Sequence, residues 1–166
     1  MTEPVEDRWS DQYPELGTEP VPIEPYVSRK YFELERDRIF RKVWLNVGRV
    51  EQIAREGDYF VYDLPVCDTS IVVVRGQKGR VHAFHNMCSH RGNKVAWAKS
   101  GSCKKFTCKF HGWTYDLAGQ VKLVPDENRF FALKKENLAL TPVSVDLWAG
   151  FVFIHLDPDP SETLRE

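Results

Sequence analysis

The sequence lacks several features that would assign it to a membrane, secreted or nucleic-acid-binding class. None of its apolar runs approaches the roughly 18 residues of a membrane-spanning helix. Its first residues contain neither the basic region nor the apolar core of a secretory signal. The formal net charge is only −1 at pH 7, so the chain as a whole has no bias toward nucleic acid. We therefore expect a cytoplasmic protein that binds neither membranes nor nucleic acids.

Cysteine is scarce, and acidic residues are missing from one long stretch. In a chain without an export signal, four cysteines predict metal ligands and free thiols rather than a disulfide framework. No Asp or Glu occurs between Thr69 and Tyr115, so this stretch predicts a positive surface on an otherwise acidic chain. It contains nine basic residues: Arg75, Lys78, Arg80, Arg91, Lys94, Lys99, Lys104, Lys105 and Lys109.

The length of 166 residues suits one domain with an N-terminal extension. Residues 1–27 contain five prolines and seven acidic residues, so we expect an acidic arm that is extended alone or packs on a second domain or subunit. Ser28 can cap a helix over residues 28–44. We interpret the apolar stripe of this helix as core packing. The stripe comprises Tyr31, Phe32, Leu34, Ile39, Phe40 and Val43.

Short β-rich runs follow from Trp44 and predict a domain over residues 45–158. The fold we expect is mostly β, an antiparallel β-sandwich after an N-terminal helix, with a metal-binding subdomain inserted at about residues 86–125. The runs are residues 57–64, 69–75, 80–86, 114–116, 120–123, 143–148 and 150–155.

Two short motifs carry metal donors of two kinds. Cys88-Ser-His90 and, after a gap of seventeen residues, Cys108-Lys-Phe-His111 each supply one thiol and one imidazole. Structural zinc sites tend to pair like donors on one arm. A mixed pair on each arm suits a two-iron centre, in which one iron binds both cysteines and the other binds both histidines. A mononuclear Cys2His2 zinc-binding module is the alternative.

The spacing of each motif is compatible with a shared site. Alternate positions of an extended segment face the same way, so Cys88 and His90 can both point at a metal. Cys108 and His111 require a tight turn instead. Gly92 and Gly112 follow the two histidines and allow the chain to bend sharply there.

The longer strings Cys88-Ser-His90-Arg91-Gly92 and Cys108-Lys-Phe-His111-Gly112-Trp113 resemble the cluster motif of Rieske proteins. The likeness is greatest to the α-subunits of ring-hydroxylating oxygenases, and it extends from about Tyr31 to Pro158. The resemblance implies the Rieske fold and a [2Fe–2S] cluster whose ligands are Cys88, His90, Cys108 and His111.

The resemblance also implies an electron-transfer role. In that family the cluster receives electrons from a ferredoxin or reductase and passes them to a mononuclear non-haem Fe(II) in a separate catalytic domain, usually of a neighbouring subunit. His111 would face that acceptor. The sequence has no second His/His/carboxylate set, so we expect residues 159–166 to begin a linker to an absent catalytic domain. A stand-alone Rieske ferredoxin, which carries electrons without being part of an enzyme, is the alternative.

The basic stretch predicts an acidic ferredoxin or reductase as the electron donor, and a merely solvated face is the alternative. By the same resemblance, high-potential Rieske proteins carry a further Cys in each arm, joined as a disulfide, and a hydroxyl after the second His. Asn93, Phe110 and Trp113 stand at those positions. We therefore predict a potential at the low end of the roughly −150 to +300 mV range of Rieske centres.

The remaining histidines and cysteines predict no second metal site. His85 and His90 have a ligand-like spacing, but no carboxylate accompanies them as the third ligand of an iron site. We expect Cys67 and Cys103 to be spare thiols, and His82 and His155 to be structural or exposed.

Overall fold

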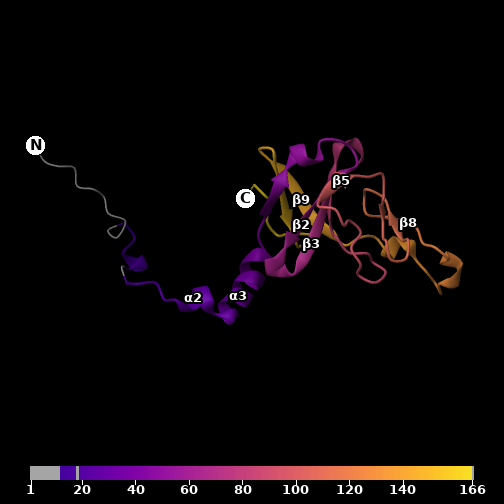
Figure 1. Ribbon diagram of the computed structural model, residues 1–166. Helices are drawn as coiled ribbons and strands as arrows, with labels where there is room; N and C mark the ends of the chain where they lie inside the picture. Colours follow the sequence, from indigo (N-terminus) through magenta and orange to yellow (C-terminus); the bar gives the residue numbers. More distant parts are fainter. Residues whose placement is uncertain (1–11, 18, 166) are drawn as a thin grey trace, which may run out of the picture. The chain divides into compact units, whose positions relative to one another are not determined.

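The computed structural model describes residues 12–17 and 19–165 (Figure 1). Residues 1–11 and 18 of the predicted arm, and Glu166 of the predicted linker, lie outside the described residues. The chain forms two compact units that divide between Glu33 and Leu34. Within the described part of the chain, no helix is both long enough and apolar enough to cross a bilayer.

The N-terminal helical segment differs from the prediction at both ends. A short helix, α2 (Glu24–Val27), lies within the predicted arm, and its proline stands in the first turn, where the missing N–H costs no hydrogen bond. After Ser28 comes α3 (Arg29–Glu35), which continues into a wider π-helical turn at Arg36–Phe40. The N–H of Lys42 then bonds the Ile39 carbonyl at 2.8 Å and closes the last turn. The predicted helix over 28–44 was therefore too long, and the expectation of an extended arm was wrong for residues 24–27.

Five of the six residues in the apolar stripe of this segment are exposed, and only Phe40 is half-buried. Tyr31, Phe32 and Leu34 are 37%, 42% and 38% exposed, and Ile39 is 48% exposed. The prediction of core packing was wrong because helical spacing identifies an apolar face but not the surface that covers it.

The second unit is built on a seven-stranded antiparallel sheet in the order β1-β10-β9-β4-β3-β2-β5. The first two residues of β9 pair with β4 and the others pair with β10, so this strand joins the two halves of a curled sheet. The strands are β1 (Leu45–Arg49), β2 (Asp58–Leu64), β3 (Thr69–Arg75), β4 (Val81–His85), β5 (Ser100–Ser102), β9 (Pro142–Trp148) and β10 (Phe151–His155).

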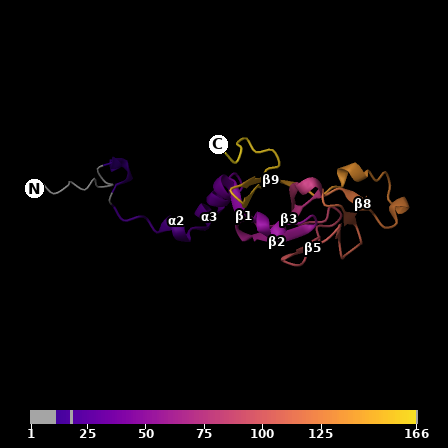
Figure 2. The same ribbon diagram turned by 90° about the horizontal axis from the view of Figure 1, so that it is seen from above.

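A smaller antiparallel sheet lies in the chain between β4 and β9. It contains β6 (Phe106–Thr107), β7 (Thr114–Tyr115) and β8 (Val121–Leu123), with β7 in the middle. Figures 1 and 2 show β8 at one end of the larger sheet. The predicted mostly β, antiparallel fold is confirmed, and the predicted metal ligands lie in the loops around this smaller sheet.

Alternation along β3 separates two apolar cores. Ile71 and Val73 face a core between the halves of the curled sheet, whereas Val72 and Val74 face a second core that includes both motif cysteines. All four side chains are fully buried. One strand therefore supports the scaffold on one face and the candidate site on the other.

Candidate metal centre

Two loops with the same backbone turn carry the four predicted ligands. In the loop after β4, the N–H of Gly92 donates to the Cys88 carbonyl at 2.9 Å. In the loop between β6 and β7, the N–H of Gly112 donates to the Cys108 carbonyl, also at 2.9 Å. Both glycines have φ of +73°, a left-handed conformation that a side chain would strain. Each motif glycine therefore closes a tight turn beside its cysteine.

A buried asparagine anchors the first loop to the sheet. Asn86 follows β4 and is only 3% exposed. Its side-chain oxygen accepts hydrogen bonds from the N–H groups of Val95 and Ala96 at 3.1 and 2.9 Å, and its amide donates to the Ala96 carbonyl at 2.8 Å. These partners satisfy a polar group that burial would otherwise penalise. Sequence reasoning did not identify Asn86, because its partners lie nine and ten residues further along the chain.

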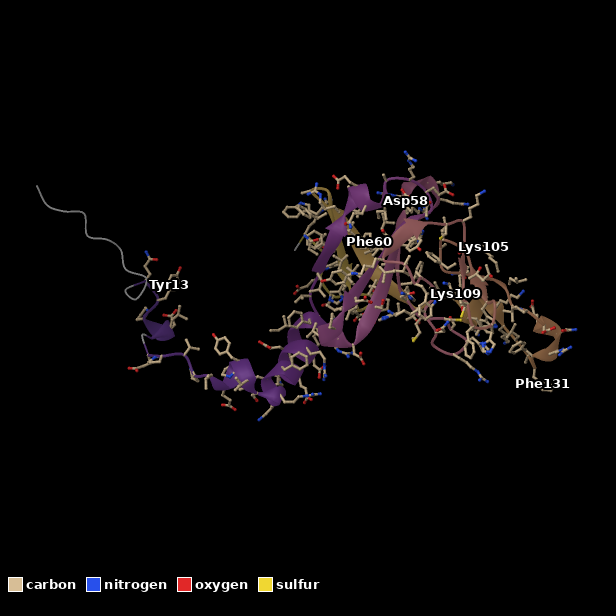
Figure 3. All side chains as sticks on the ribbon, in the orientation of Figure 1. Tyr13, Asp58, Phe60, Lys105, Lys109 and Phe131 are labelled. Atoms are coloured by element: carbon tan, nitrogen blue, oxygen red, sulfur yellow. The ribbon has the colours of Figure 1, made fainter. Side chains whose placement is uncertain are left out.

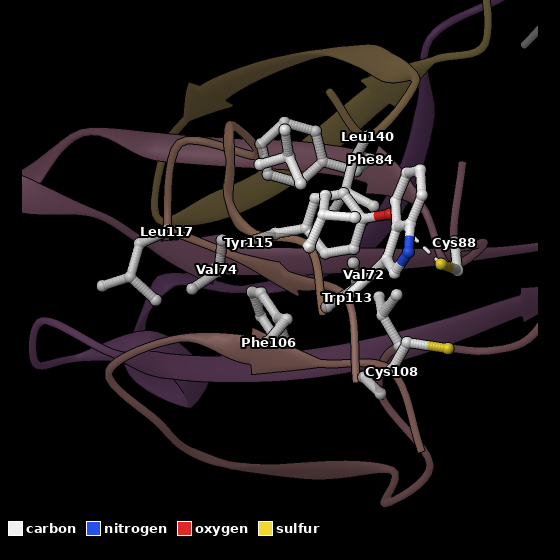
Figure 4. Packing of buried hydrophobic residues seen from close by; sticks show 14 residues of the cluster. Val72, Val74, Phe84, Cys88, Phe106, Cys108, Trp113, Tyr115, Leu117 and Leu140 are labelled. Carbon is white, nitrogen blue, oxygen red and sulfur yellow. Dashed lines mark hydrogen bonds between the residues drawn. The ribbon is translucent and has the colours of Figure 1, made fainter. Parts of the chain in front are cut away.

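The two cysteine sulfurs lie at the same edge of the second core (Figure 4). The Tyr115 hydroxyl oxygen is 3.1 Å from the Cys88 sulfur and accepts a hydrogen bond from the Ser89 N–H at 3.1 Å. Because an N–H can only donate, the proton of the tyrosine is available to the sulfur. Burial, followed by the hydrogen bond to Cys88, raises the pKa of Tyr115, so this hydroxyl remains a donor.

The Cys108 sulfur is surrounded by N–H donors. The Asn93 side-chain amide donates to it over 3.7 Å. Burial alone would raise the pKa of Cys108, but hydrogen bonds from the Phe110 N–H, the Asn93 amide and the His111 N–H outweigh it and lower that pKa. The pKa of Cys88 is raised, mainly by burial. The donors around Cys108 favour the thiolate, which is the form that binds metals.

The two motif histidines lie against each other. Their ring centroids are 4.7 Å apart, and the His90 ring also stacks on Trp113 at 4.7 Å with an interplanar angle of 6°. The Nδ1 atom of His90 is buried and has no hydrogen-bond partner among the described residues. Loss of solvation, followed by the charges of His111 and Arg91, lowers the pKa of His90. A neutral imidazole with one unsatisfied buried nitrogen fits a metal ligand.

The rim beside His111 is aromatic and open to solvent. His111 is exposed, and Phe110, which is 61% exposed, lies 3.9 Å from it between ring centroids. Phe130 closes the other side, with its ring 6.3 Å from His90 and 6.1 Å from Trp113. The site is therefore buried at its sulfurs and reaches the surface at one imidazole.

The donor set fits a two-iron centre. Cys88 and Cys108 belong to the same buried core, and the rings of His90 and His111 lie 4.7 Å apart between centroids. Nowhere in the described chain are three His, Cys, Asp or Glu side chains grouped as ligands of one metal ion. A [2Fe–2S] centre of this kind takes two protein ligands on each iron, and one pair of cysteines with one pair of histidines meets that requirement.

The other histidines and cysteines have different surroundings. His85 Nδ1 lies 2.9 Å from the Thr69 hydroxyl, and the His82 ring stacks on Phe84. Burial raises the pKa of both remaining thiols, Cys67 and Cys103, and this keeps them protonated.

Comparison with known proteins agrees with this geometry. Residues 43–142 match the family model of the Rieske [2Fe–2S] domain. Biphenyl 2,3-dioxygenase subunit alpha of Rhodococcus jostii (strain RHA1) is 35% identical over 135 residues, which are 81% of this chain and 29% of that protein. The carnitine monooxygenase oxygenase subunit of Acinetobacter pittii (strain PHEA-2) is 34% identical over 132 residues, which are 80% of this chain and 35% of that protein.

Solved structures share the fold. Naphthalene 1,2-dioxygenase from Rhodococcus sp. superposes with a TM-score of 0.80 at 30% identity, covering 87% of this chain and 33% of that one. The apo form of a quaternary ammonium Rieske monooxygenase gives a TM-score of 0.80 at 33% identity, covering 86% of this chain and 41% of that one. The chain thus spans about a third of the length of the curated relatives it matches.

Proposed function

This chain belongs to the Rieske [2Fe–2S] domain family, and we propose that it is the electron-transfer domain of an aromatic-ring-hydroxylating oxygenase α-subunit. In this proposal Cys88 and Cys108 hold one iron of the cluster, and His90 and His111 hold the other. When bound, the cluster supplies a one-electron acceptor and donor. The observation that carries the assignment is the buried Nδ1 of His90, which has no hydrogen-bond partner among the described residues and belongs to the same loop as buried Cys88.

The surrounding residues support electron transfer by shaping the environment of the ligands. Trp113 and Tyr115 are 3% and 0% exposed and exclude water from the sulfurs. The Tyr115 hydroxyl donates to Cys88, and N–H donors surround Cys108. Such hydrogen bonds and burial set the potential of an iron–sulfur centre. The exposed His111 gives a partner direct access to this end of the site.

We propose an acidic ferredoxin or reductase as the electron donor. Apart from half-buried Arg75, the nine basic residues between Thr69 and Tyr115 are exposed. Lys94 forms an ion pair with Asp63 at 3.7 Å, and Lys109 lies over the Trp97 ring at 5.8 Å. Figure 3 labels Lys105 and Lys109 at the same end of the second unit where Figure 1 labels β8. A basic surface of this kind speeds the encounter with an acidic protein.

We propose a mononuclear iron in a catalytic oxygenase domain, or in a neighbouring subunit, as the electron acceptor. The aromatic rim at His111 supports an interface there, because aromatic side chains are enriched at protein contacts. Aromatic ring hydroxylation is the proposed reaction of the whole enzyme. Oxidation of a quaternary ammonium compound, as in the name of the quaternary ammonium Rieske monooxygenase, is the competing outcome of a substrate test.

The named relatives are oxygenase subunits, which supports the oxygenase role over a stand-alone ferredoxin carrier. Thiolate ligands without a disulfide suit a reducing compartment, so we propose the cytoplasm as the location.

Stopped-flow reduction by an acidic [2Fe–2S] ferredoxin tests the donor role. The rate should fall as salt is added, and the double charge reversal Lys104→Glu/Lys105→Glu should lower it by about tenfold. The matched reversal Lys30→Glu/Lys42→Glu changes the net charge equally but lies outside the basic stretch, so the rate should change little. A salt-insensitive rate that is unchanged by the first pair contradicts donor docking. A chain that contains the cluster but accepts no electrons contradicts the proposed function.

A further inference from the structure

The two ligand loops are tied crosswise at their sulfurs. Tyr115, which follows the second loop, has its hydroxyl 3.1 Å from the sulfur of Cys88 in the first loop. Asn93, which follows the first loop, has its amide nitrogen 3.7 Å from the sulfur of Cys108 in the second. Each cysteine therefore has a side-chain donor that comes from the opposite loop.

Asn93 also fixes the first loop through its backbone. Its carbonyl accepts a hydrogen bond from the Cys88 N–H at 2.8 Å. In the second loop the Trp113 carbonyl accepts the equivalent bond from the Cys108 N–H, also at 2.8 Å. Asn93 and Trp113 thus occupy matching backbone positions. The half-buried Asn93 side chain crosses to the other loop, whereas the Trp113 ring stacks on His90.

We propose that Asn93 is a positioning residue that ties the two ligand loops together and raises the reduction potential of the centre. The inference rests on the proposed function, because it requires the cluster to be present. The Asn93 hydrogen bond to the Cys108 sulfur links the two loops without a covalent bond.

Electrostatics gives the direction in which Asn93 shifts the reduction potential. A metal-bound thiolate is negative, so the amide presents its N–H and keeps its carbonyl oxygen away from the sulfur. Reduction adds an electron to the centre and increases the negative charge on the sulfurs. The Asn93 N–H is therefore a better partner for the reduced form, and its removal should make reduction less favourable.

Two substitutions of Asn93 separate the effect of its hydrogen-bond donor from the effect of its side-chain volume. Asn93→Leu keeps a side chain of similar size without a donor, and Asn93→Asp keeps the shape but turns a carboxylate oxygen toward the sulfur. The reduction equilibrium constant should fall about three- to tenfold in Asn93→Leu, and tenfold corresponds to about 59 mV for a one-electron couple. It should fall further in Asn93→Asp. The Fe–S(Cys) stretching bands in resonance Raman spectra should also shift.

The control is Asn137→Leu, which removes an exposed side-chain amide further along the chain and should leave both readouts unchanged. A full cluster content with an unchanged midpoint and unchanged Raman bands in Asn93→Leu overturns the proposal. If both variants lose the cluster, the native protein labelled with 15N in its asparagine side-chain amides provides the test. Its reduced form should show a 15N coupling in pulsed EPR, and the absence of this coupling overturns the inference. A native chain without any cluster instead refutes the proposed function.

Discussion

The hydrogen bond between Tyr115 and Cys88 gives the most quantitative prediction. Tyr115 is fully buried, and Tyr115→Phe removes only its oxygen. This leaves the Cys88 sulfur without its side-chain donor and the Ser89 N–H without its acceptor. A fully buried N–H that loses its partner costs roughly 1–3 kcal/mol, and this bond is only part-buried, so the free energy of unfolding should fall by about 1 kcal/mol.

The potential should fall as well. Hydrogen bonds to charged groups contribute about 1.5–3 kcal/mol, and we take about 1–2 kcal/mol of this as the preference for the reduced centre. At about 59 mV for each 1.4 kcal/mol in a one-electron couple, the midpoint should become about 40–90 mV more negative.

An EPR-monitored redox titration measures this shift. The control is Tyr59→Phe, because Tyr59 packs against the same core but meets the Phe106 ring edge-on at 5.5 Å instead of a sulfur. Tyr59→Phe should leave the midpoint unchanged. A midpoint in Tyr115→Phe that equals the native value, with the full cluster present, would refute the role given to this hydroxyl.

Three further predictions concern the turns, the potential and the metal. Gly112→Ala should lower the urea concentration at the unfolding midpoint more than Gly79→Ala. Both glycines have φ of +73°, but only at Gly112 would the new Cβ lie 3.1 Å from a Pro125 atom. The backbone strain should be about 1–2 kcal/mol in both variants, with about 1 kcal/mol more at Gly112 from overpacking, and equal midpoints would contradict this. The midpoint potential of the native chain, measured by voltammetry, should lie below zero, near the roughly −150 mV end of the Rieske range. A clearly positive value would refute the low potential predicted from Asn93, Phe110 and Trp113. Chelation of the iron should increase hydrogen exchange in the ligand loops but leave β3 protected, because the core of Ile71 and Val73 contains no residue of the ligand loops. Uniform loss of protection would show that the scaffold itself depends on the metal.

The sequence predicted those parts of the structure that depend on local patterns. The predicted strand over residues 69–75 is found at Thr69–Arg75, because a β-branched run bounded by turns needs no further information. The close turns at Gly92 and Gly112 were expected from glycine after each histidine, and both adopt positive φ. The four candidate ligands were proposed from donor types, spacing and the Rieske resemblance, and their role as ligands stays a prediction.

The parts that the sequence could not predict depend on distant partners. Ser100–Ser102 forms β5 although its central Gly101 disfavours a strand, because Asp58–Phe60 of β2 offers an open edge for pairing. The short β6 was missed for the same reason, since its two residues pair only with β7. The hydrogen bonds of Asn86 and Asn93 cross between loops, and no spacing rule predicts them. The helical stripe at residues 31–43 was misassigned because burial depends on what covers a face.

The most direct test of the two-iron assignment is metal and sulfide analysis of the purified native chain, combined with EPR after chemical reduction. We predict coloured protein with iron and acid-labile sulfide in equal amounts, and a [2Fe–2S] signal that appears on reduction and is lost in Cys88→Ser. Colourless protein containing zinc, or no metal at all, would contradict the account.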